Sequence, residues 1–326
     1  MMIHRRKILG LVPGALGLAT LPALAQSDKP VRIIVPYPAG GGVDISARVT
    51  AAGMRGLYGD NVLVDNRPGA GGRIGIDLVK NSEPDGNTIL VVPNFVFTIY
   101  PHIYSKLTYD LSRDLTPVSS ICSIGYSVSV GPGVPESVKT IAEYAQWVRA
   151  NPGKASFGSG SPGTTPHFTG VMLAKALNLP LVHVGYKGGA PLSQDLIGGQ
   201  IPMAVQSLPE AYQLSKAGRI RSLAITTPKR SPLMPDVPTL GESGVPNLVV
   251  ADVFGAFVPI KTPDERVRRL AAAIQASVAK PESQEALNKL TFIPQTITLA
   301  AYASSVTQEH RDWEQVIKAS GFKAEE

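Results

Sequence analysis

Short apolar runs alternate with helical patterns along most of the chain, and small residues close each run. Strands are expected at 31–35, 62–65 and 88–92, and the apolar spacing typical of helices occupies 43–49 and 76–80. Loops rich in glycine or proline join these elements. Strands that alternate with helices through short loops favour a mainly parallel sheet, so the sequence predicts an α/β fold.

The pattern changes near 118–130, where two extended apolar runs, 118–124 and 126–130, follow each other closely. A second series of alternating elements then begins. It predicts helices at 140–150, 165–177, 190–198 and 209–216, and strands at 155–158, 181–185, 201–205 and 220–225.

The last part of the chain is less regular. Residues 227–249 are rich in proline and glycine and predict no regular element. An extended run at 250–258 follows, and helices are expected near 263–278 and 298–319. The chain therefore crosses between the two alternating series near residue 124 and returns near residue 250.

This order predicts two α/β domains, the first interrupted by the second. Residues 26–124 and 250–326 would form domain 1, and residues 125–249 would form domain 2. The two crossings would make a hinge. Ligands of open α/β sheets bind beyond the carboxyl ends of the strands, so two facing domains predict a ligand cleft that can close.

The first 25 residues have the pattern of an export signal. The basic run 4–7 precedes an apolar stretch, 8–24, that glycine and proline interrupt, and Ala23-Leu24-Ala25 predicts cleavage before Gln26. The stretch is too broken for a transmembrane span. Arg5-Arg6 resembles a twin-arginine signal, and both that route and the general route stay open. The sequence therefore predicts that the signal is removed and that the mature protein is periplasmic.

Charge and cysteine content narrow the function classes. The signal contains three of the 31 Lys and Arg residues. The mature chain therefore has 28 basic and 25 acidic residues, which gives a net charge of +3. The absence of basic runs and the 6% aromatic content argue against nucleic-acid binding. A slight excess of bases suits an anionic small ligand. Cys122, the one cysteine, lies in an apolar stretch and is expected to be a core residue rather than a nucleophile.

Two segments have the features of anion sites. In the loop 36–44, glycines let backbone amides approach a ligand just before a helix, whose first amides lack partners and carry partial positive charge. Asp44 in the first turn suits the helix dipole and could also cap the helix. In the segment 156–167, Ser and Thr hydroxyls gather at a second helix start. Ordinary N-capping would explain that segment alone, but two such segments favour anion binding.

Other kinds of site are not supported. The loop 36–44 lacks the Gly-Lys-Ser/Thr ending of a phosphate loop, and 69–75 has Ile74 where a dinucleotide loop needs glycine. Ser159 and Ser161 do not meet the Gly-x-Ser-x-Gly spacing of hydrolases. His167 and His183 could serve as bases, but Asp195 is the only acid near them, and the histidines show no metal-ligand spacing. We expect no catalysis, metal or cofactor; an exported hydrolase-like enzyme that uses the same cleft is the alternative.

Taken together, the motifs resemble those of the Bug-type periplasmic receptors, the solute-binding components of tripartite tricarboxylate transporters. The resemblance covers nearly all of the mature chain. It rests on the segments 35–48, 65–72, 84–86, 183–188 and 235–239.

The resemblance implies a two-domain Venus-flytrap receptor that hands a carboxylate to a membrane permease. A ligand-loaded partner of a sensor protein is a further alternative, and we expect a monomer. The first loop would hold the carboxylate, Asp44 would support that loop, and the second domain would supply a small polar loop and a turn. The residues so assigned are Tyr37, Ala39, Gly40, Gly41, Asp44, Asn94, Ser159, Ser161, Gly163, Thr164, Thr165, Tyr186, Lys187, Gly188, Gly189 and Gln206.

The chain departs from the family pattern at three places. Pro93 to Phe97 replace small hydroxyl residues and histidine, the second-domain loop carries Pro162 and Pro166, and Val253 replaces an aromatic residue. The carboxylate anchor is unaffected. A C4 to C6 aliphatic acid and a larger aromatic carboxylate both stay open as ligands.

Overall fold

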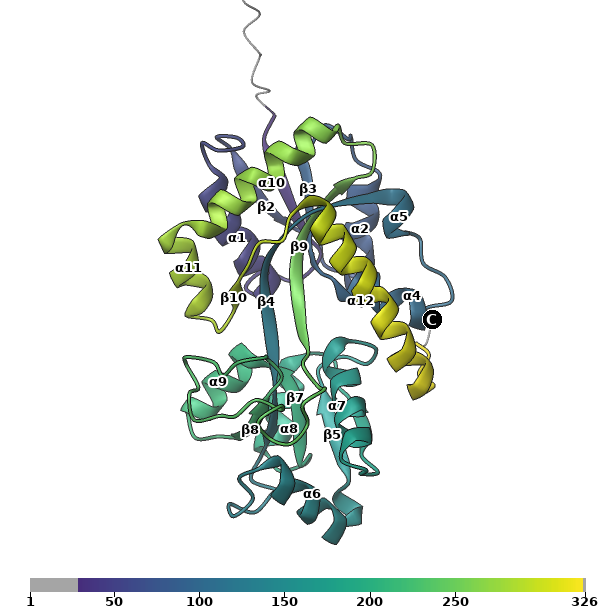
Figure 1. Ribbon diagram of the computed structural model, residues 1–326, viewed down its shortest axis with the longest axis vertical. Helices are drawn as coiled ribbons and strands as arrows, with labels where there is room; N and C mark the ends of the chain where they lie inside the picture. The colour runs from purple at the N-terminus through teal and green to yellow at the C-terminus, as the bar shows by residue number, and fades with distance from the viewer. Residues whose placement is uncertain (1–28, 325–326) are drawn as a thin grey trace, which may run out of the picture.

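The computed structural model describes residues 29–324 as two lobes joined by long strands (Figure 1). The expected signal peptide, residues 1–25, and its cleavage site lie outside the described residues. The alternation of strands and helices expected from the sequence is present in both lobes.

The first lobe is built on three parallel strands, β1 (Val31–Val35), β2 (Val62–Asn66) and β3 (Thr88–Pro93), in the order β2-β1-β3. Helices α1 (Gly42–Met54) and α2 (Arg73–Lys80) connect them. β1 and β3 are apolar along nearly their whole length because both of their faces are covered, as in other parallel sheets. The carboxyl ends of the strands and the start of α1 therefore meet at one edge of this lobe.

Two long antiparallel strands connect the lobes. β4 (Leu115–Val130) pairs with β9 (Ala251–Pro259), and Figure 1 shows the two strands side by side, with β4 running toward the second lobe and β9 returning from it. The two extended runs expected at 118–124 and 126–130 are thus one strand. Gly125 between them does not end the strand; a β-carbon there would lie 2.3 Å from Thr227 Cγ2, so glycine leaves room for the Thr227 side chain to pack against the strand.

The second lobe contains β5 (Ser156–Ser159), β6 (Val182–Gly185) and β7 (Met203–Ser207), in the order β4-β7-β5-β6. β8 (Arg221–Ile225) pairs with β4. The helices of this lobe are α6 (Ile141–Ala150), α7 (Thr165–Ala176), α8 (Gly189–Ile197) and α9 (Leu208–Lys216), with a short η2 (Pro152–Lys154).

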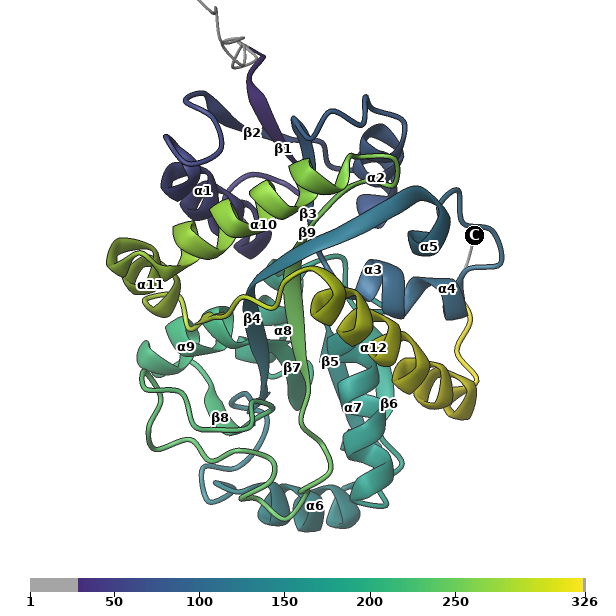
Figure 2. The ribbon, with the colours of Figure 1, turned by 45° about the horizontal axis from the view of Figure 1, so that its top comes forward.

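Several short elements escaped prediction, most of them because they have only two to four residues and show no helical or strand period. They are η1 (Ala70–Gly72), α3 (Phe95–Thr98), α4 (Tyr100–Ile103), α5 (Leu111–Asp114), α11 (Pro281–Asn288) and β10 (Ile293–Pro294). The longer α10 (Asp264–Ala279) lies across the strands of the first lobe, as predicted near 263–278 (Figure 2).

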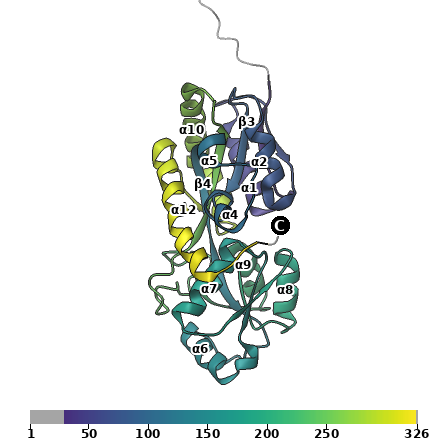
Figure 3. The ribbon, with the colours of Figure 1, turned by 90° about the vertical axis from the view of Figure 1, so that its right-hand side faces the viewer.

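The last helix, α12 (Leu299–Ser320), belongs by sequence to the first lobe but reaches the second (Figure 3). The ring of Trp313 lies 6.0 Å from that of Phe168 in α7, and the ring of Phe322 lies 4.8 Å from that of His167. The lobes are therefore in contact along α12 as well as through β4 and β9.

Apolar clusters fill both faces of the first sheet, and one of them continues into the second lobe. Cys122 is completely buried, and burial raises the pKa of its thiol. The expectation that Cys122 is a core residue is therefore met, since a buried neutral thiol packs as a small apolar side chain.

Candidate functional site

A cavity of about 640 Å³ lies between the two lobes, a volume typical of sites for small organic molecules. The segment from Tyr37 to Ile45 and the end of β3 line it from the first lobe, whereas the loop before α7 and the starts of α8 and α9 line it from the second. Of the residues assigned from the sequence, those that line it are Tyr37, Gly40, Gly41, Ser161, Thr164, Gly189 and Gln206.

Helix α1 presents its N-terminus to this cavity. Gly41 is the N-cap residue, and Gly42 and Val43 begin the helix. No side chain caps the helix in the described part of the chain. The first amides of a helix have no intrahelical acceptor and lie at the positive end of the dipole, so they can bind a carboxylate.

Asp44 supports the loop from behind. The carboxylate is buried and accepts hydrogen bonds from the backbone N–H of Gly40 (2.8 Å), from Nδ2 of Asn66 (2.9 Å) and from Nε of Arg48 (2.9 Å). Burial raises the pKa of Asp44, but the hydrogen bonds from Arg48, Gly40 and Asn66 together hold it below its ordinary value. Because the Gly40 amide is bonded to Asp44, the amides available to a ligand begin at Gly41.

The hydroxyl groups at the start of α7 do not cap that helix. Thr164 is the N-cap residue, and its hydroxyl donates instead to the carbonyl of Ser161 (2.7 Å). Thr165 Oγ1 donates to Asp252 (2.5 Å), and Ser159 Oγ lies 2.8 Å from His183 Nε2. Ordinary N-capping is thus not the role of these side chains.

The remaining assigned residues do not line the cavity. Asn94 is buried beside α12, where its side chain bonds Glu309 (3.0 Å) and Tyr302 (2.6 Å). Tyr186 donates to Asp195 (2.9 Å). The complete set outside the cavity lining is Ala39, Asp44, Asn94, Ser159, Gly163, Thr165, Tyr186, Lys187 and Gly188.

Asp252 on β9 also faces the cavity, and the sequence analysis missed it. Its buried carboxylate accepts hydrogen bonds from Thr165 in α7 and from Tyr126 in β4. Burial raises the pKa of Asp252 to about 6, which outweighs the two hydrogen bonds that lower it. A lone acid in an apolar strand was the signal that could have identified it.

The geometry does not form a hydrolase site. Ser159 and His183 are close enough to act as nucleophile and base, but Ser159 is completely buried and does not line the cavity. Burial lowers the pKa of His183 to about 4. Asp195, which the sequence offered as the third member, bonds Tyr186 instead. Among residues 29–324, no cluster of His, Cys, Asp and Glu could hold a metal ion.

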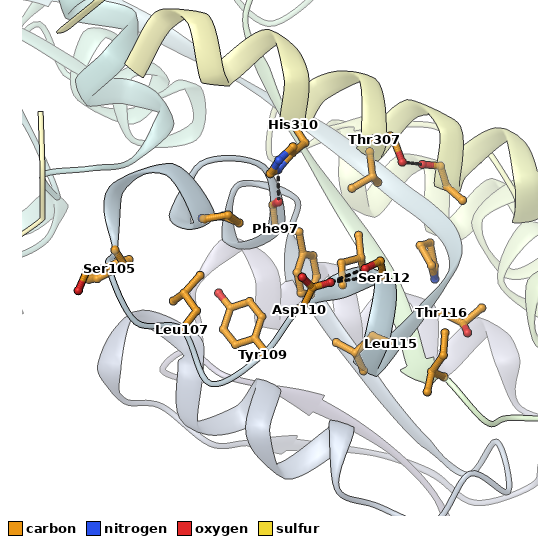
Figure 4. Close-up of a pocket in the computed structure, with 17 residues that line it drawn as sticks. Phe97, Ser105, Leu107, Tyr109, Asp110, Ser112, Leu115, Thr116, Thr307 and His310 are labelled. Atoms are coloured by element: carbon orange, nitrogen blue, oxygen red, sulfur yellow. Dashed lines mark hydrogen bonds between the residues drawn. The ribbon is translucent and has the colours of Figure 1, made fainter. Parts of the chain in front are cut away.

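A second cavity, of about 620 Å³, lies on the first lobe between α12 and the segment 104–117 (Figure 4). Two of its polar residues bond within the protein: Ser112 donates to Asp110 (2.5 Å), and His310 Nδ1 lies 3.1 Å from the carbonyl of Phe97. None of the residues assigned from the sequence lines it. The interlobe cavity is therefore the better candidate.

Comparison with known proteins also indicates a ligand-binding protein. Residues 46–322 match the family model described as "Tripartite tricarboxylate transporter family receptor". The "UPF0065 protein in tcbD-tcbE intergenic region" of Pseudomonas sp. (strain P51) is 36% identical over 88% of this chain and 86% of that relative. No described helix has the length and apolar character needed to cross a membrane.

Two solved structures resemble the whole described chain. The periplasmic binding protein BugD is 31% identical, with a TM-score of 0.78 over 91% of this chain and 99% of BugD. An R. palustris protein solved with adipate is 30% identical, with a TM-score of 0.82 over 91% of this chain and 99% of that one. These likenesses confirm the two-domain periplasmic-binding-protein fold that was expected from the sequence.

Proposed function

Since this chain belongs to the tripartite tricarboxylate transporter receptor family, a family of periplasmic solute-binding receptors, we propose that it captures an organic carboxylate in the interlobe cavity and delivers it to a membrane permease. The observation that carries the proposal is the uncapped start of α1, which lines a cavity between the two lobes. The relative solved with adipate supports a carboxylate as ligand.

Each lobe would make different contacts with the ligand. The amides that follow Gly40 would hold the carboxylate, and Ser161 and Thr164 would meet the ligand from the opposite wall. The assigned residues that do not line the cavity would hold the loops in the conformation that places the lining residues. We place the domain boundaries, as from the sequence, at 124/125 and 249/250, where β4 and β9 pair beside Gly125 and Ala251.

Closure of the cavity would present the loaded receptor to its permease. Asp252 lies at the beginning of β9, where this strand enters the first lobe, and the bond between Asp252 and Thr165 connects the start of α7 to the strand. A ligand that binds both walls would favour the closed arrangement by its differential affinity. We propose that the protein acts in this way as a monomer and without catalysis.

Carboxylates are expected to raise the thermal stability of the mature protein without being consumed. A ligand that binds only the folded state stabilises it by about 2.7 kcal/mol at a concentration of 100 Kd. A thermal-shift screen of aliphatic and aromatic carboxylic acids identifies the ligand, and mass spectrometry after incubation shows whether it is altered. Steady turnover of the best ligand would favour the enzyme alternative instead.

The protein recovered from the periplasm is expected to begin at Gln26. The motivation is the basic run, the apolar stretch and Ala23-Leu24-Ala25 at the N-terminus. N-terminal sequencing of the protein from a periplasmic fraction measures this directly. Recovery of the chain with Met1 in the cytoplasm alone would contradict export.

A further inference from the structure

The charged side chains of the interlobe cavity are all acidic. Among the described residues that line it, Glu210 and Asp252 are the charged ones, and there is no lysine, arginine or histidine. A carboxylate ligand in this cavity would therefore be held by backbone amides and helix dipoles rather than by a basic side chain. A second functional group on the ligand would therefore lie near negatively charged side chains.

Glu210 occupies a position that a second ligand anion would need. Helix α8 begins at Gly189 without a side-chain cap, and the Glu210 carboxylate lies against this start. A β-carbon at Gly189 would be 2.3 Å from Oε1 and 3.0 Å from Oε2 of Glu210. Ser207 holds the carboxylate there, since its hydroxyl donates to Oε2 (2.7 Å). The positive end of α8 thus already has an anion from the chain itself.

A buried polar group without a partner marks the same wall as a ligand contact. Gln206 is 2% exposed and lines the cavity, and its Nε2 has no hydrogen-bond partner in the described structure. Its Oε1 accepts only a long bond from Ser193 (3.5 Å). A buried N–H donor left unpaired costs free energy, so an acceptor on the ligand, such as a hydroxyl oxygen, would satisfy it, whereas an ammonium group has no acceptor to offer.

The opposite wall is apolar. Phe95, Phe254 and Phe292 line the cavity beside the start of α1, and the rings of Phe254 and Phe292 meet edge to face at 5.9 Å. A hydrocarbon or aromatic body of a ligand would pack on these rings. The cavity therefore combines the start of α1 and an adjoining apolar wall in the first lobe with the acidic side chain of Glu210 in the second lobe.

We infer that the ligand is a monocarboxylate with an apolar body and an amino or hydroxyl group at its far end, and that Glu210 excludes dicarboxylates. This inference rests on the proposed function, because it assumes that the start of α1 holds a carboxylate. An ammonium or hydroxyl group would donate to Glu210, whereas a second carboxylate would be repelled by it.

Two matched ligand series test the inference by calorimetry. The first is hexanoate, 6-aminohexanoate and adipate; the second is 4-methylbenzoate, 4-(aminomethyl)benzoate and terephthalate. In the better-binding series, the amino acid should bind about tenfold to hundredfold more tightly than the dicarboxylate. Glu210→Gln should remove most of this preference by strengthening dicarboxylate binding and weakening binding of the amino acid. Glu136→Gln, an exposed acid outside the cavity, makes the same change in net charge and should leave the preference intact.

The outcomes separate the two claims. Dicarboxylates that bind the wild type as tightly as the amino acids, with no effect of Glu210→Gln, would overturn this inference and leave the proposed receptor function standing. No binding in either series would overturn both. Urea unfolding of Glu210→Gln without ligand should differ from the wild type by at most about 1 kcal/mol, because Glu210 is exposed and loses only the interaction of its charge with the starts of α8 and α9.

Discussion

Gly42→Val is expected to weaken carboxylate binding by about a hundredfold or more while leaving the fold intact. Gly42 is the first residue of α1 and lines the cavity. A β-carbon there would lie 3.0 Å from Cζ of Phe292 and 3.6 Å from Phe254, so a valine side chain would take the space between the helix start and the aromatic wall. Two displaced bonds to a charged group, at about 1.5 to 3 kcal/mol each, account for this loss.

The stability cost of Gly42→Val should be at most about 1 kcal/mol, because Phe292 must shift slightly but valine favours the helix over glycine. Gly40 is a poorer choice for this test. Its φ of +83° would strain any other residue, and its amide is bonded to Asp44. Gly153→Val is the matched control, because a β-carbon there meets no atom within 4 Å. Calorimetry and urea unfolding measure both effects; normal binding by Gly42→Val would exclude the start of α1 as the anchor.

Asp252→Asn is expected to gain stability relative to the wild type as the pH rises. The buried carboxylate has its pKa raised from the ordinary 3.8 to about 6, so the folded state holds its proton more tightly than the unfolded state. The wild-type carboxyl group therefore adds to the free energy of unfolding below about pH 4, where it is protonated in both states. This contribution is lost as the pH rises through the folded-state pKa of about 6. This pKa shift corresponds to a loss of about 3 kcal/mol in the free energy of unfolding of the wild type. Asparagine keeps the size and the bond from Thr165 but does not ionise.

Urea unfolding of the two ligand-free proteins between pH 4 and pH 7.5 measures the effect. Burial lowers the pKa of His167 and His183 to about 4, and these groups are common to both proteins and cancel in the difference. Burial raises the pKa of Glu309 to about 7, and the charge of Asp252 adds to this shift, so the part due to Asp252 remains in the difference and has the same sign. Asp236→Asn, an exposed carboxylate, should give a flat difference. If Asp252→Asn is also flat, folding does not raise the pKa of the Asp252 carboxyl group.

The loop that follows β1 was predictable because it depends on local pattern. A short apolar strand, a glycine run and an amphipathic helix occur in direct succession, and the structure keeps them in that order from β1 to α1. Asp44 was placed correctly behind the loop because its partner Gly40 lies only four residues away. Local spacing sufficed for both.

Contacts between distant parts of the chain were not predictable in the same way. The hydroxyl of Thr165 was assigned to a ligand, but it bonds Asp252, 87 residues away. Asn94 was assigned to the cleft, but it bonds Glu309, 215 residues away on α12. Nothing in the local pattern around these polar residues distinguishes a distant protein partner from a ligand.

The most direct test of carboxylate capture at the start of α1 is an NMR titration. The account predicts that the tightest-binding carboxylate saturably shifts the backbone amide resonances of Gly41, Gly42 and Val43, with the Kd found by calorimetry. Saturable shifts confined to the second cavity, around Tyr109 and His310, with the start of α1 unchanged, would contradict it.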